Sequence, residues 1–471
     1  MAQSTRWETA IVWFRRDLRL ADHPALSDAV THARHVVPLF VVDRGLLEVS
    51  AARAWFLAGS LEELHASLRA RGSGLLVREG RAADVVAEVA AETRADVVLA
   101  SRDVTPRSHR RDAAVAEALA ADGRELRLRP GTLLVEPETM TTSAGKAYGV
   151  FTPFWRALQA APRRAVLPAP TDIPGPAHVG PVGTPDWLAQ LPRPHDELPP
   201  PGAAAATERA RRWVATGLAD YGSERDGLDG SGSSHLGPDL HLGTLSPLQL
   251  ESAAMEAGED ATPFVRQLAW REFYHHLLFA RRSWSDRWAE HPLQASFRAE
   301  PDDPEAAAAW REGRTGIPVV DAGMRQLAAT GWLSNRARLV VASFLTRHLL
   351  LDYRIGERHF LRHLIDGDVA NNLGGWEWTA GVGADAQPWF RIFNPVRQGR
   401  RFDPEGEWVR RWVPELASVP TRFVHAPWEM EADDAAASGV TLGSDYPQPI
   451  VDLAEARARA LAAFKSATSA S

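Results

Sequence analysis

The stretch Ala10-Ile11-Val12-Trp13-Phe14-Arg15-Arg16-Asp17-Leu18-Arg19 decides the fold of the N-terminal part of this 471-residue chain. Its first five residues are apolar and rich in aromatic and β-branched side chains, which predicts a buried strand. Charged residues follow the strand in place of a Gly-x-Gly pattern. This argues against an ordinary dinucleotide-phosphate loop at the turn.

Four further apolar runs follow this strand and alternate with segments of helical periodicity. Such an alternation predicts a doubly wound parallel sheet. The predicted strands are 10–14, 35–42, 74–77, 96–100 and 125–128, and the predicted helices include 53–71, 82–93 and 107–121.

The rest of the chain divides by composition. Proline is dense in residues 161–204, which is typical of a long surface linker. From Thr207 onward the periodicity is helical almost throughout. We therefore expect an α/β domain over 1–136, a Pro-rich interdomain linker over 137–206, and a larger all-α domain over 207–471.

Composition excludes several classes of protein. The chain has no Cys, which excludes disulfides, thiol nucleophiles and cysteine-ligated metal clusters. Its net charge of −7 argues against a wholly basic nucleic-acid coat but permits a local basic patch, which would consist of Arg because Lys146 and Lys465 are the only lysines. With no apolar run of membrane-spanning length and no signal-peptide pattern, we expect a cytoplasmic protein.

Chemistry-bearing residues concentrate in the segment 365–378, which reads Ile-Asp-Gly-Asp-Val-Ala-Asn-Asn-Leu-Gly-Gly-Trp-Glu-Trp. Its glycines permit close backbone approach. Its two acids can bind a metal, cap a helix or accept hydrogen bonds from a ribose, and a purely structural loop is the alternative.

Three other segments carry polar clusters. Gln267, Trp270 and Arg271 share one face of a predicted helix by the i, i+3, i+4 rule. The run 230–237, rich in Gly and Ser, is either a flexible loop or a cradle whose backbone N–H groups hold a phosphate. A third polar cluster, 332–338, precedes an apolar helix predicted over 339–345.

Six motifs in order resemble the photolyase/cryptochrome family, and most of all the bacterial class I cyclobutane pyrimidine dimer photolyases. The resemblance runs nearly end to end. The motifs are residues 12–20, 270–274, 356–358, 365–378, 390–395 and 445–451.

The resemblance implies an FAD held in the helical domain. It places Asn372 at the reactive N5 edge of the flavin, where an amide accommodates an N5–H and suits a reduced flavin. Plant-type cryptochromes resemble this pattern but carry Asp there, and insect-type ones carry Cys. The cofactor-binding residues that the resemblance implies are Tyr221, Ser233, Ser234, His235, Leu236, Gly237, Arg271, Arg338, Asp366, Gly367, Asp368 and Asn372.

The implied activity is light-driven repair of cyclobutane pyrimidine dimers, a carbon–carbon lyase reaction on a dimer flipped out of UV-damaged DNA. Trp270 and Trp378 match positions that pack against the flipped bases. The full set of implied DNA-binding residues is Arg225, Gln267, Trp270, Tyr274, Asn335, Arg336, Trp378 and Gln398, and Arg391, Arg397, Arg400 and Arg401 are candidates for phosphate contacts. We expect a monomer without a bound metal.

Two departures concern the substrate: Gln267, and Leu339, which replaces the Met expected in dimer photolyases. Gln267 stands where class I dimer photolyases carry Glu, and an amide donates a hydrogen bond but supplies no proton. Gln is familiar there from (6-4) photolyases, which need two His for acid–base work. The matching positions here are Asn335 and Leu339, so the (6-4) interpretation fails on its chemistry.

A third departure concerns flavin photoreduction, which in related proteins runs through three Trp residues. Trp376 matches the residue next to the flavin, but the middle position is Tyr353 and the outer one is Glu300. Glu cannot relay an electron. Photoreduction must therefore end on Tyr353, use another aromatic residue, or be weak.

Arg53 and Asp103 match positions that bind an 8-hydroxy-5-deazaflavin antenna, with folate, another flavin or no antenna as alternatives. The rival to repair is a cryptochrome-like blue-light photoreceptor with the same fold. A light-independent flavoprotein acting on another substrate is a third interpretation. Asn372 and the short tail after Val451 favour the enzyme, whereas Gln267, Leu339 and the interrupted Trp chain favour the photoreceptor.

Overall fold

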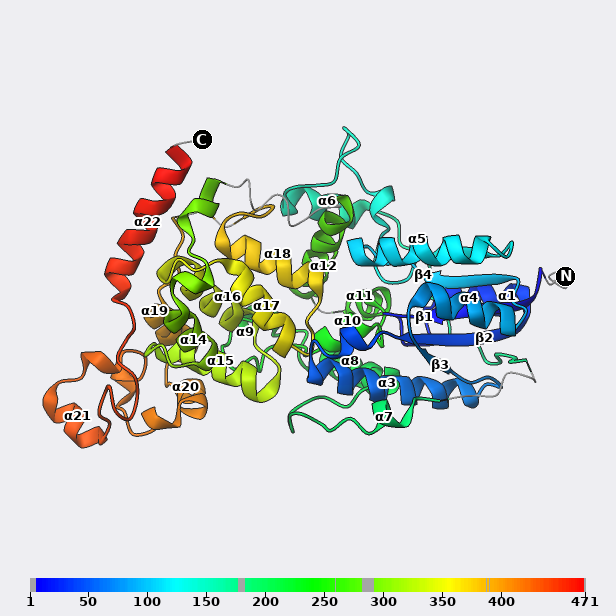
Figure 1. Ribbon diagram of the computed structural model, residues 1–471. Helices are drawn as coiled ribbons and strands as arrows, with labels where there is room; N and C mark the ends of the chain where they lie inside the picture. The colour runs from blue at the N-terminus through cyan, green and yellow to red at the C-terminus, as the bar shows by residue number, and fades with distance from the viewer. Residues whose placement is uncertain are drawn as a thin grey trace. The chain divides into compact units, whose positions relative to one another are not determined.

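The computed structural model describes residues 6–176, 183–258, 260–281, 292–386, 388 and 390–469. The chain folds into two compact units (Figure 1). Unit 1 comprises residues 1–219, 234–282 and 365–370, and unit 2 comprises 220–233, 283–364 and 371–471. The domain boundaries at 136 and 206 stay a prediction. The chain passes from one compact unit to the other after residues 219, 233, 282, 364 and 370.

Unit 1 contains the predicted parallel sheet. Its strand order is β3-β2-β1-β4-β5 and every neighbouring pair is parallel, which confirms the doubly wound arrangement. The chain runs outward from β1 in one direction through β2 and β3, and in the other through β4 and β5. The strands are β1 Trp7–Phe14, β2 Ala33–Val42, β3 Leu76–Glu79, β4 Val97–Ser101 and β5 Glu125–Arg129.

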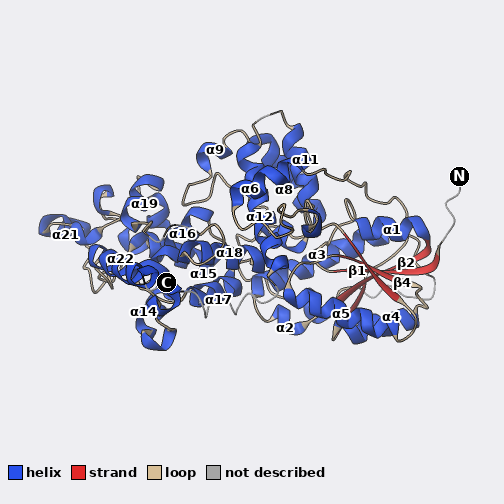
Figure 2. Cartoon of the chain, turned by 90° about the horizontal axis from the view of Figure 1, so that it is seen from above, coloured by secondary structure: helices blue, strands red, loops and turns tan. Residues whose placement is uncertain are grey.

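Helices cover both faces of this sheet, with α4 and α5 on one side and α1 on the other (Figure 2). Ile11 and Trp13 of β1 pack with apolar residues of α4 and α5 in one core cluster. Burial on both faces explains why the strands read in sequence as continuous apolar runs. The helices are α1 Pro24–His32, α4 Ala82–Glu92 and α5 Pro106–Ala120.

Three of the remaining helices of unit 1, namely α3, α10 and α12, carry predicted site residues. Their bounds are α2 Arg44–Leu47, α3 Ala51–Arg69, η1 Pro137–Thr139, α6 Phe151–Ala160, α7 Asp186–Ala189, α8 Ala203–Thr216, α10 Gly237–Leu242, α11 Pro247–Glu256 and α12 Thr262–Ala280.

Part of the predicted linker is folded rather than lying free on the surface. Helix α6 buries Phe151, Phe154 and Leu158 and packs against α12. These three residues follow helical spacing, so one face of the helix is apolar. Further along the linker Ile173 and Leu198 are also buried. Residues 177–182 of the predicted linker lie outside the described residues.

Unit 2 is helical and is built around a large apolar core that includes Trp310, Met324, Val341 and Trp376. Its helices are α9 Tyr221–Glu224, η2 Pro292–Ser296, η3 Glu300–Asp302, α14 Pro304–Glu312, α15 Pro318–Thr330, α16 Asn335–Ser343, η4 Phe344–His348, α17 Tyr353–His363, α18 Val369–Ala380, α19 Pro395–Phe402, α20 Glu407–Trp412, η5 Pro414–Leu416, η6 Thr421–Phe423, η7 Pro427–Glu429, α21 Ala432–Ser438 and α22 Leu453–Ser469.

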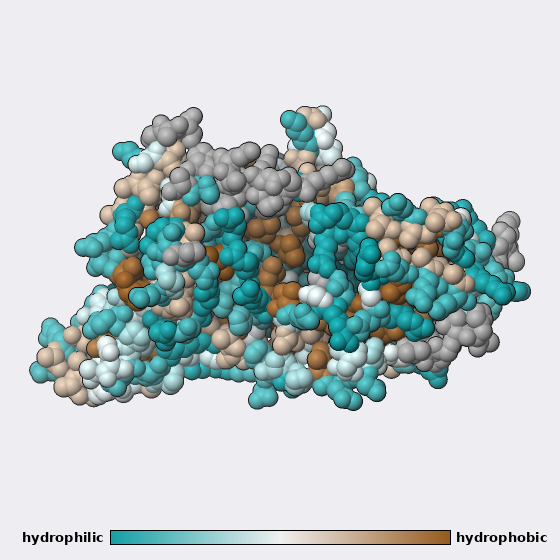
Figure 3. Space-filling view, viewed as in Figure 1, coloured by the Kyte–Doolittle hydropathy of each residue, from teal (hydrophilic) through white to brown (hydrophobic). Residues whose placement is uncertain are grey.

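The helical character predicted from Thr207 onward is confirmed, with one local difference. The apolar helix predicted over 339–345 instead ends as α16 at Ser343, and the chain continues through η4 in a π-helical turn. Among the described residues no helix combines the length and apolarity needed to cross a bilayer. Hydrophilic residues predominate on the face shown in Figure 3, and hydrophobic ones are confined to smaller patches.

Candidate functional site

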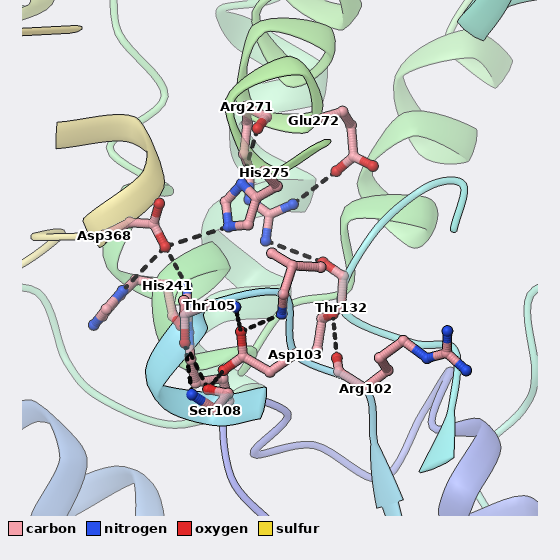
Figure 4. Close-up of polar contacts among 12 residues, drawn as sticks. Arg102, Asp103, Thr105, Ser108, Thr132, His241, Arg271, Glu272, His275 and Asp368 are labelled. Atoms are coloured by element: carbon pink, nitrogen blue, oxygen red, sulfur yellow. Dashed lines mark hydrogen bonds and ion pairs between the residues drawn. The ribbon is translucent and has the colours of Figure 1, made fainter. Parts of the chain in front are cut away.

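Asp368 is the centre of a buried polar cluster in unit 1 (Figure 4). Its carboxylate forms an ion pair with Arg16, and one oxygen lies 3.4 Å from Nε2 of His275 and 3.9 Å from Nδ1 of His241. Burial disfavours the charged carboxylate, but the neighbouring His275 and Arg16 side chains hold the pKa of Asp368 well below its usual range. Asp368 therefore stays ionised near neutral pH.

Tight backbone contacts hold this cluster together. Arg16 is the second residue after β1, and its Nε donates to the carbonyl of His241 at 3.0 Å. Gly243, with φ of 70°, lies so close to the Arg16 carbonyl that a Cβ would collide with it. Burial lowers the pKa of His241 to about 4, so this imidazole is neutral at pH 7. The cluster thus combines one arginine with one buried carboxylate.

The predicted cofactor residues Gly237 and Asp366 lie against each other in unit 1. A Cβ on Gly237 would stand 2.5 Å from Oδ2 of Asp366, so no larger residue fits without a shift. The backbone N–H of Asp368 donates to the carbonyl of Asp366 at 2.6 Å, which turns the chain sharply through Gly367. The structure therefore brings together Gly237, Asp366, Gly367 and Asp368, and their role in holding a cofactor stays a prediction.

Arg271 is held by its own helix and by the segment after β5. Its Nη1 donates to Glu272 Oε1 at 2.8 Å and its Nη2 to the carbonyl of Thr132 at 3.0 Å. Glu272 is buried and also accepts from the N–H of Leu134 at 2.7 Å. Burial raises the pKa of Glu272, against the lowering effect of Arg271. The bonds to Thr132 and Leu134 thus tie α12 to the segment after β5.

Gln267, Trp270 and Tyr274 are half-buried on α12, at positions i, i+3 and i+7. This spacing places them along one side of the helix. The helix predicted for Gln267, Trp270 and Arg271 is confirmed. Trp270 stacks on Phe151 of α6, with ring centroids 3.8 Å apart.

In unit 2, Asn372 on α18 donates through Nδ2 to Glu357 on α17. The two bonds run to the Glu357 carbonyl at 3.0 Å and to its Oε1 at 3.2 Å. Burial raises the pKa of Glu357, and the hydrogen bond from Asn372 opposes that rise. Because both acceptors are oxygen, the amide is fixed with its NH₂ toward Glu357 and its carbonyl oxygen turned away.

Two glycines near Trp376, Gly356 and Gly375, differ in the space that surrounds them. A Cβ on Gly356 would collide with the Trp376 ring, so the glycine lets the indole lie directly against the backbone of α17. Gly375 shows the opposite: a Cβ there would meet no atom of the described residues within 4 Å. A glycine inside a helix weakens it by roughly 1 kcal/mol relative to alanine. The packing of the described residues therefore gives no reason for Gly375.

Trp376 is buried among aromatic rings. Its indole lies edge-to-face against Phe360, with centroids 5.0 Å apart, and against Trp310, with centroids 6.0 Å apart. Tyr353 is 2% exposed at the start of α17, and its pKa is raised by burial and by the negative charge of Glu377. Glu300 is half-buried and forms an ion pair with Arg311.

A second cluster in unit 2 contains predicted DNA-binding residues. Arg336 donates to Gln398 Oε1 at 3.4 Å, lies 2.8 Å from Asp226 Oδ2, and has its guanidinium 4.5 Å from the ring centroid of Phe402. Arg225 precedes Asp226 and lies 6.0 Å from the ring centroid of Tyr221. The structure thus brings Arg336 close to Gln398 and to the segment that carries Arg225.

The other predicted residues of unit 2 are placed separately. Asn335 is exposed at the start of α16, and Trp378 is half-buried on α18. Arg338 donates through Nε to the carbonyl of Leu333 at 3.0 Å. Burial raises the pKa of Tyr221 to about 12, with Arg225 opposing.

The predicted phosphate loop is divided between the two units. The N–H of Ser233 in unit 2 donates to the Gly230 carbonyl at 3.0 Å. Ser234 in unit 1 accepts from the N–H of Leu236 at 3.4 Å through Oγ. His235 between them has φ of 53°, in the left-handed region that favours glycine.

The two predicted antenna residues have different partners. Asp103 follows β4 and accepts hydrogen bonds from the N–H of Val104 at 2.7 Å and from Ser108 Oγ at 2.8 Å. Burial disfavours its charge, but Arg16, Arg15 and Arg111 lower the pKa of Asp103 to about 2. Arg53 lies near the start of α3, where burial lowers its pKa to about 10 against the charge of Asp366.

Several site residues were not predicted. Arg16 and His275 could have been found, because Arg16 lies just after the first strand and His275 lies one helical turn after Arg271. Glu357 lies in a quoted motif without an assigned role. Trp310 and Phe151 carried no local signal, since an isolated aromatic residue reads as core.

Known proteins share this architecture along nearly the whole chain. The family model for DNA photolyase matches residues 10–175, and the model described as the FAD binding domain of DNA photolyase matches residues 264–466. The chain is 44% identical to a deoxyribodipyrimidine photo-lyase of Streptomyces griseus over 96% of this chain and 98% of that protein.

Solved structures agree. A bacterial class III photolyase from Agrobacterium tumefaciens superposes with a TM-score of 0.90 at 37% identity, covering 100% of this chain and 99% of that one. A Synechocystis cryptochrome gives a TM-score of 0.88 at 31% identity, covering 97% and 98%. An archaeal photolyase from Sulfolobus tokodaii with two FAD molecules gives 0.82 at 28% identity, covering 97% and 100%.

The chain therefore has a flavoprotein-type enzyme fold with a doubly wound N-terminal part and a helical FAD-binding part. It belongs to the DNA photolyase family. The expectations of this family, of this fold and of a photolyase-type enzyme are confirmed. The closer assignment to class I stays a prediction.

Proposed function

We propose that this protein repairs cyclobutane pyrimidine dimers in UV-damaged DNA, using light and a reduced FAD. Asn372 carries the proposal: its amide is fixed by Glu357, and the resemblance puts that amide at the N5 edge of the flavin. Relatives named deoxyribodipyrimidine photo-lyase along nearly the whole chain support the same reaction.

The residues present fit an FAD. Gly375 offers a helix backbone that a planar ring can approach, because no atom of the described chain lies within 4 Å of where its Cβ would be. Asn372 on the same helix offers an amide for the ring edge. We propose that FAD is held by Tyr221, Ser233, Ser234, His235, Leu236, Gly237, Arg271, Arg338, Asp366, Gly367, Asp368 and Asn372. When bound, reduced and excited by light, it would supply an electron that opens the cyclobutane ring and then returns to the flavin.

The chain's own residues would bind and orient the damaged DNA. Trp270 and Trp378 offer flat indoles to the flipped bases, and stacking of a base on an aromatic ring is worth about 1–3 kcal/mol. Gln267 donates a hydrogen bond through its amide to a pyrimidine carbonyl. Arg225, Tyr274, Asn335, Arg336 and Gln398 would contact the surrounding strand, where phosphate contacts position DNA without reading sequence.

The second candidate is a cryptochrome-like photoreceptor without repair. Gln267 favours it, because a residue that cannot supply a proton stands where dimer photolyases carry an acid. Tyr353 and Glu300 in the photoreduction positions favour it as well. The similar Synechocystis cryptochrome shows that this fold occurs in proteins of that name.

For the antenna we propose an 8-hydroxy-5-deazaflavin bound near Arg53 and Asp103. Asp103 keeps its negative charge at any physiological pH, since its pKa is about 2. A second FAD is the alternative, because the Sulfolobus tokodaii photolyase is described with two FAD molecules. A monomer, the absence of a bound metal and a cytoplasmic location remain predictions.

The test is light-dependent repair. The purified holoprotein, with its flavin reduced, is incubated with UV-damaged oligothymidine in light and in darkness, and the remaining dimers are counted. Loss of dimers in light alone supports repair. A flavin-loaded protein that removes no dimers in light would leave the photoreceptor as the function. The absorption spectrum of the same sample shows which antenna copurifies.

A further inference from the structure

Phe151 on α6, which stacks on Trp270 of α12, has no part in the function proposed so far. The rings of Phe151 and Trp270 are parallel, with 3.8 Å between centroids and 3° between planes. Phe151 is 1% exposed, whereas Trp270 is half-buried. One face of the indole is therefore covered by a ring of this chain itself.

The Phe151–Trp270 stack also contacts the ring of Phe273, and Phe151 lies next to the guanidinium of Arg266. Phe273 stands perpendicular to both rings, at 82° to Phe151 and 84° to Trp270, with centroids 5.8 Å and 5.6 Å away. The guanidinium of Arg266, an exposed residue, lies 5.4 Å from the Phe151 centroid. Face and edge contacts together fix the plane of the indole, because rotation about its side-chain bonds would drive it into Phe151 or Phe273.

We propose that Phe151 is a positioning residue for substrate binding: it holds the Trp270 indole in one plane so that a flipped pyrimidine stacks on it without ordering it first. This inference rests on the proposed function, which makes Trp270 a base-stacking residue. A side chain that is already ordered loses less conformational entropy when its ligand binds. The substrate that benefits is a flat base from a lesion, not the intact duplex.

The test compares two methionine variants on the same helix. Phe151→Met keeps the apolar volume but replaces the flat ring by a flexible thioether. Phe154→Met is the matched control, because Phe154 is equally buried on α6 but its ring contacts include Phe273, at 5.3 Å, His276, at 5.1 Å, and Phe151, at 6.5 Å, rather than Trp270. The readouts are the Kd for a dimer-containing oligonucleotide, the Kd for the undamaged oligonucleotide, and Tm.

We expect Phe151→Met to raise the Kd for dimer-containing DNA by about tenfold, in line with the loss of one ordered stacking platform. The Kd for undamaged DNA stays the same. Phe154→Met should lower Tm about as much as Phe151→Met does, but should leave the Kd for dimer-containing DNA and the Kd for undamaged DNA near their wild-type values. Phe151→Tyr should bind dimer-containing DNA as tightly as wild type, because tyrosine also has a flat ring. Equal weakening by both methionine variants would overturn the proposal, as would failure of Phe151→Tyr to rescue.

A double-mutant cycle shows whether Phe151 acts through Trp270. In the Trp270→Leu background, Phe151→Met should change the Kd for dimer-containing DNA by less than about twofold, since the platform it positions is gone. A further tenfold loss there would contradict the inference. If the wild-type holoprotein itself does not prefer dimer-containing DNA, the proposed function fails; if it does and Phe151→Met behaves as wild type, only the role of Phe151 fails.

Discussion

The indole of Trp376 lies edge-to-face against the indole of Trp310, with the ring centroids 6.0 Å apart and the planes at 74°. Trp310 is fully buried and donates its indole N–H to the carbonyl of Val341 at 3.0 Å. A second tryptophan thus adjoins the one assigned next to the flavin. It is not one of the positions, Tyr353 and Glu300, that the resemblance assigns to photoreduction.

We predict that this second ring takes part in flavin photoreduction. Trp310→Phe should slow the light-driven reduction of oxidised FAD several-fold when a thiol serves as the final electron donor, because phenylalanine is much harder to oxidise than tryptophan. Tyr353→Phe should slow it further. The measurement is the loss of the oxidised-flavin absorption band during illumination without DNA.

The control for that experiment is Trp408→Phe. Trp408 lies in the same core, is 4% exposed, and also has its N–H satisfied, by Gln326 Oε1 at 2.9 Å. Both substitutions remove a similar volume and a similar hydrogen bond. Equal rates in the two variants would show that only packing was disturbed.

Replacing Asn372 by Asp should have two effects: the reduced flavin should be less stable against oxidation, and the protein should be less stable against unfolding. A carboxylate cannot donate to Glu357, whose Oε1 lies 3.2 Å from the Asn372 amide nitrogen, and two carboxylates at this distance repel each other. The unmade hydrogen bond and the repulsion should cost on the order of 1–3 kcal/mol of unfolding free energy. We expect the variant to purify with oxidised flavin and a lower Tm. Asn371→Asp adds the same charge one residue away, and an equal effect there would contradict a specific role for Asn372.

Gln267→Glu should increase the yield of dimer repair per absorbed photon. The substitution keeps the size of the side chain and adds a group that can donate a proton or a stronger hydrogen bond to a pyrimidine carbonyl. The measurement is the number of dimers removed per flash from a holoprotein with fully reduced flavin. A lower yield than wild type would mean that the amide is already the better partner in this site.

Asp103 should contribute to stability in a defined pH range. Its folded-state pKa of about 2 lies below the usual value near 3.8, so its contribution is complete above about pH 4 and is lost as the pH falls toward 2. At pH 7 Asp103→Asn should therefore lower the unfolding free energy by roughly 2 kcal/mol relative to wild type. This difference in unfolding free energy should become smaller below about pH 4. Urea titrations at several pH values measure this, with Asp122→Asn at an exposed position as the control.

The fold was largely predictable because local patterns determine most of it. The strand predicted over 10–14 extends over Trp7–Phe14, and that predicted over 35–42 extends over Ala33–Val42. Buried parallel strands read as apolar runs, and their ends are the uncertain part. Helix α6 was not predicted, because the Pro and Gly residues around it made the helical spacing of Phe151, Phe154 and Leu158 hard to recognise.

The sequence supplied candidate site residues, whose roles stay predictions, but not the contacts among them. The pairing of Arg16 with Asp368 joins positions 352 apart in sequence, and no local pattern encodes such a contact. The same is true of Phe151 on Trp270. Contacts one helical turn apart, as between Arg271 and His275, were within reach of periodicity alone.

Gly375 has a consequence for anyone who tries to stabilise this protein. Alanine at that position meets no steric obstacle among the described residues and favours the helix by about 1 kcal/mol, so a screen that ranks variants by heat resistance of the empty polypeptide would choose it. The added methyl group would stand where we place the flat face of the flavin. Selection for thermal stability therefore favours alanine at position 375, whereas selection for activity favours glycine. Screens should be run with the cofactor present.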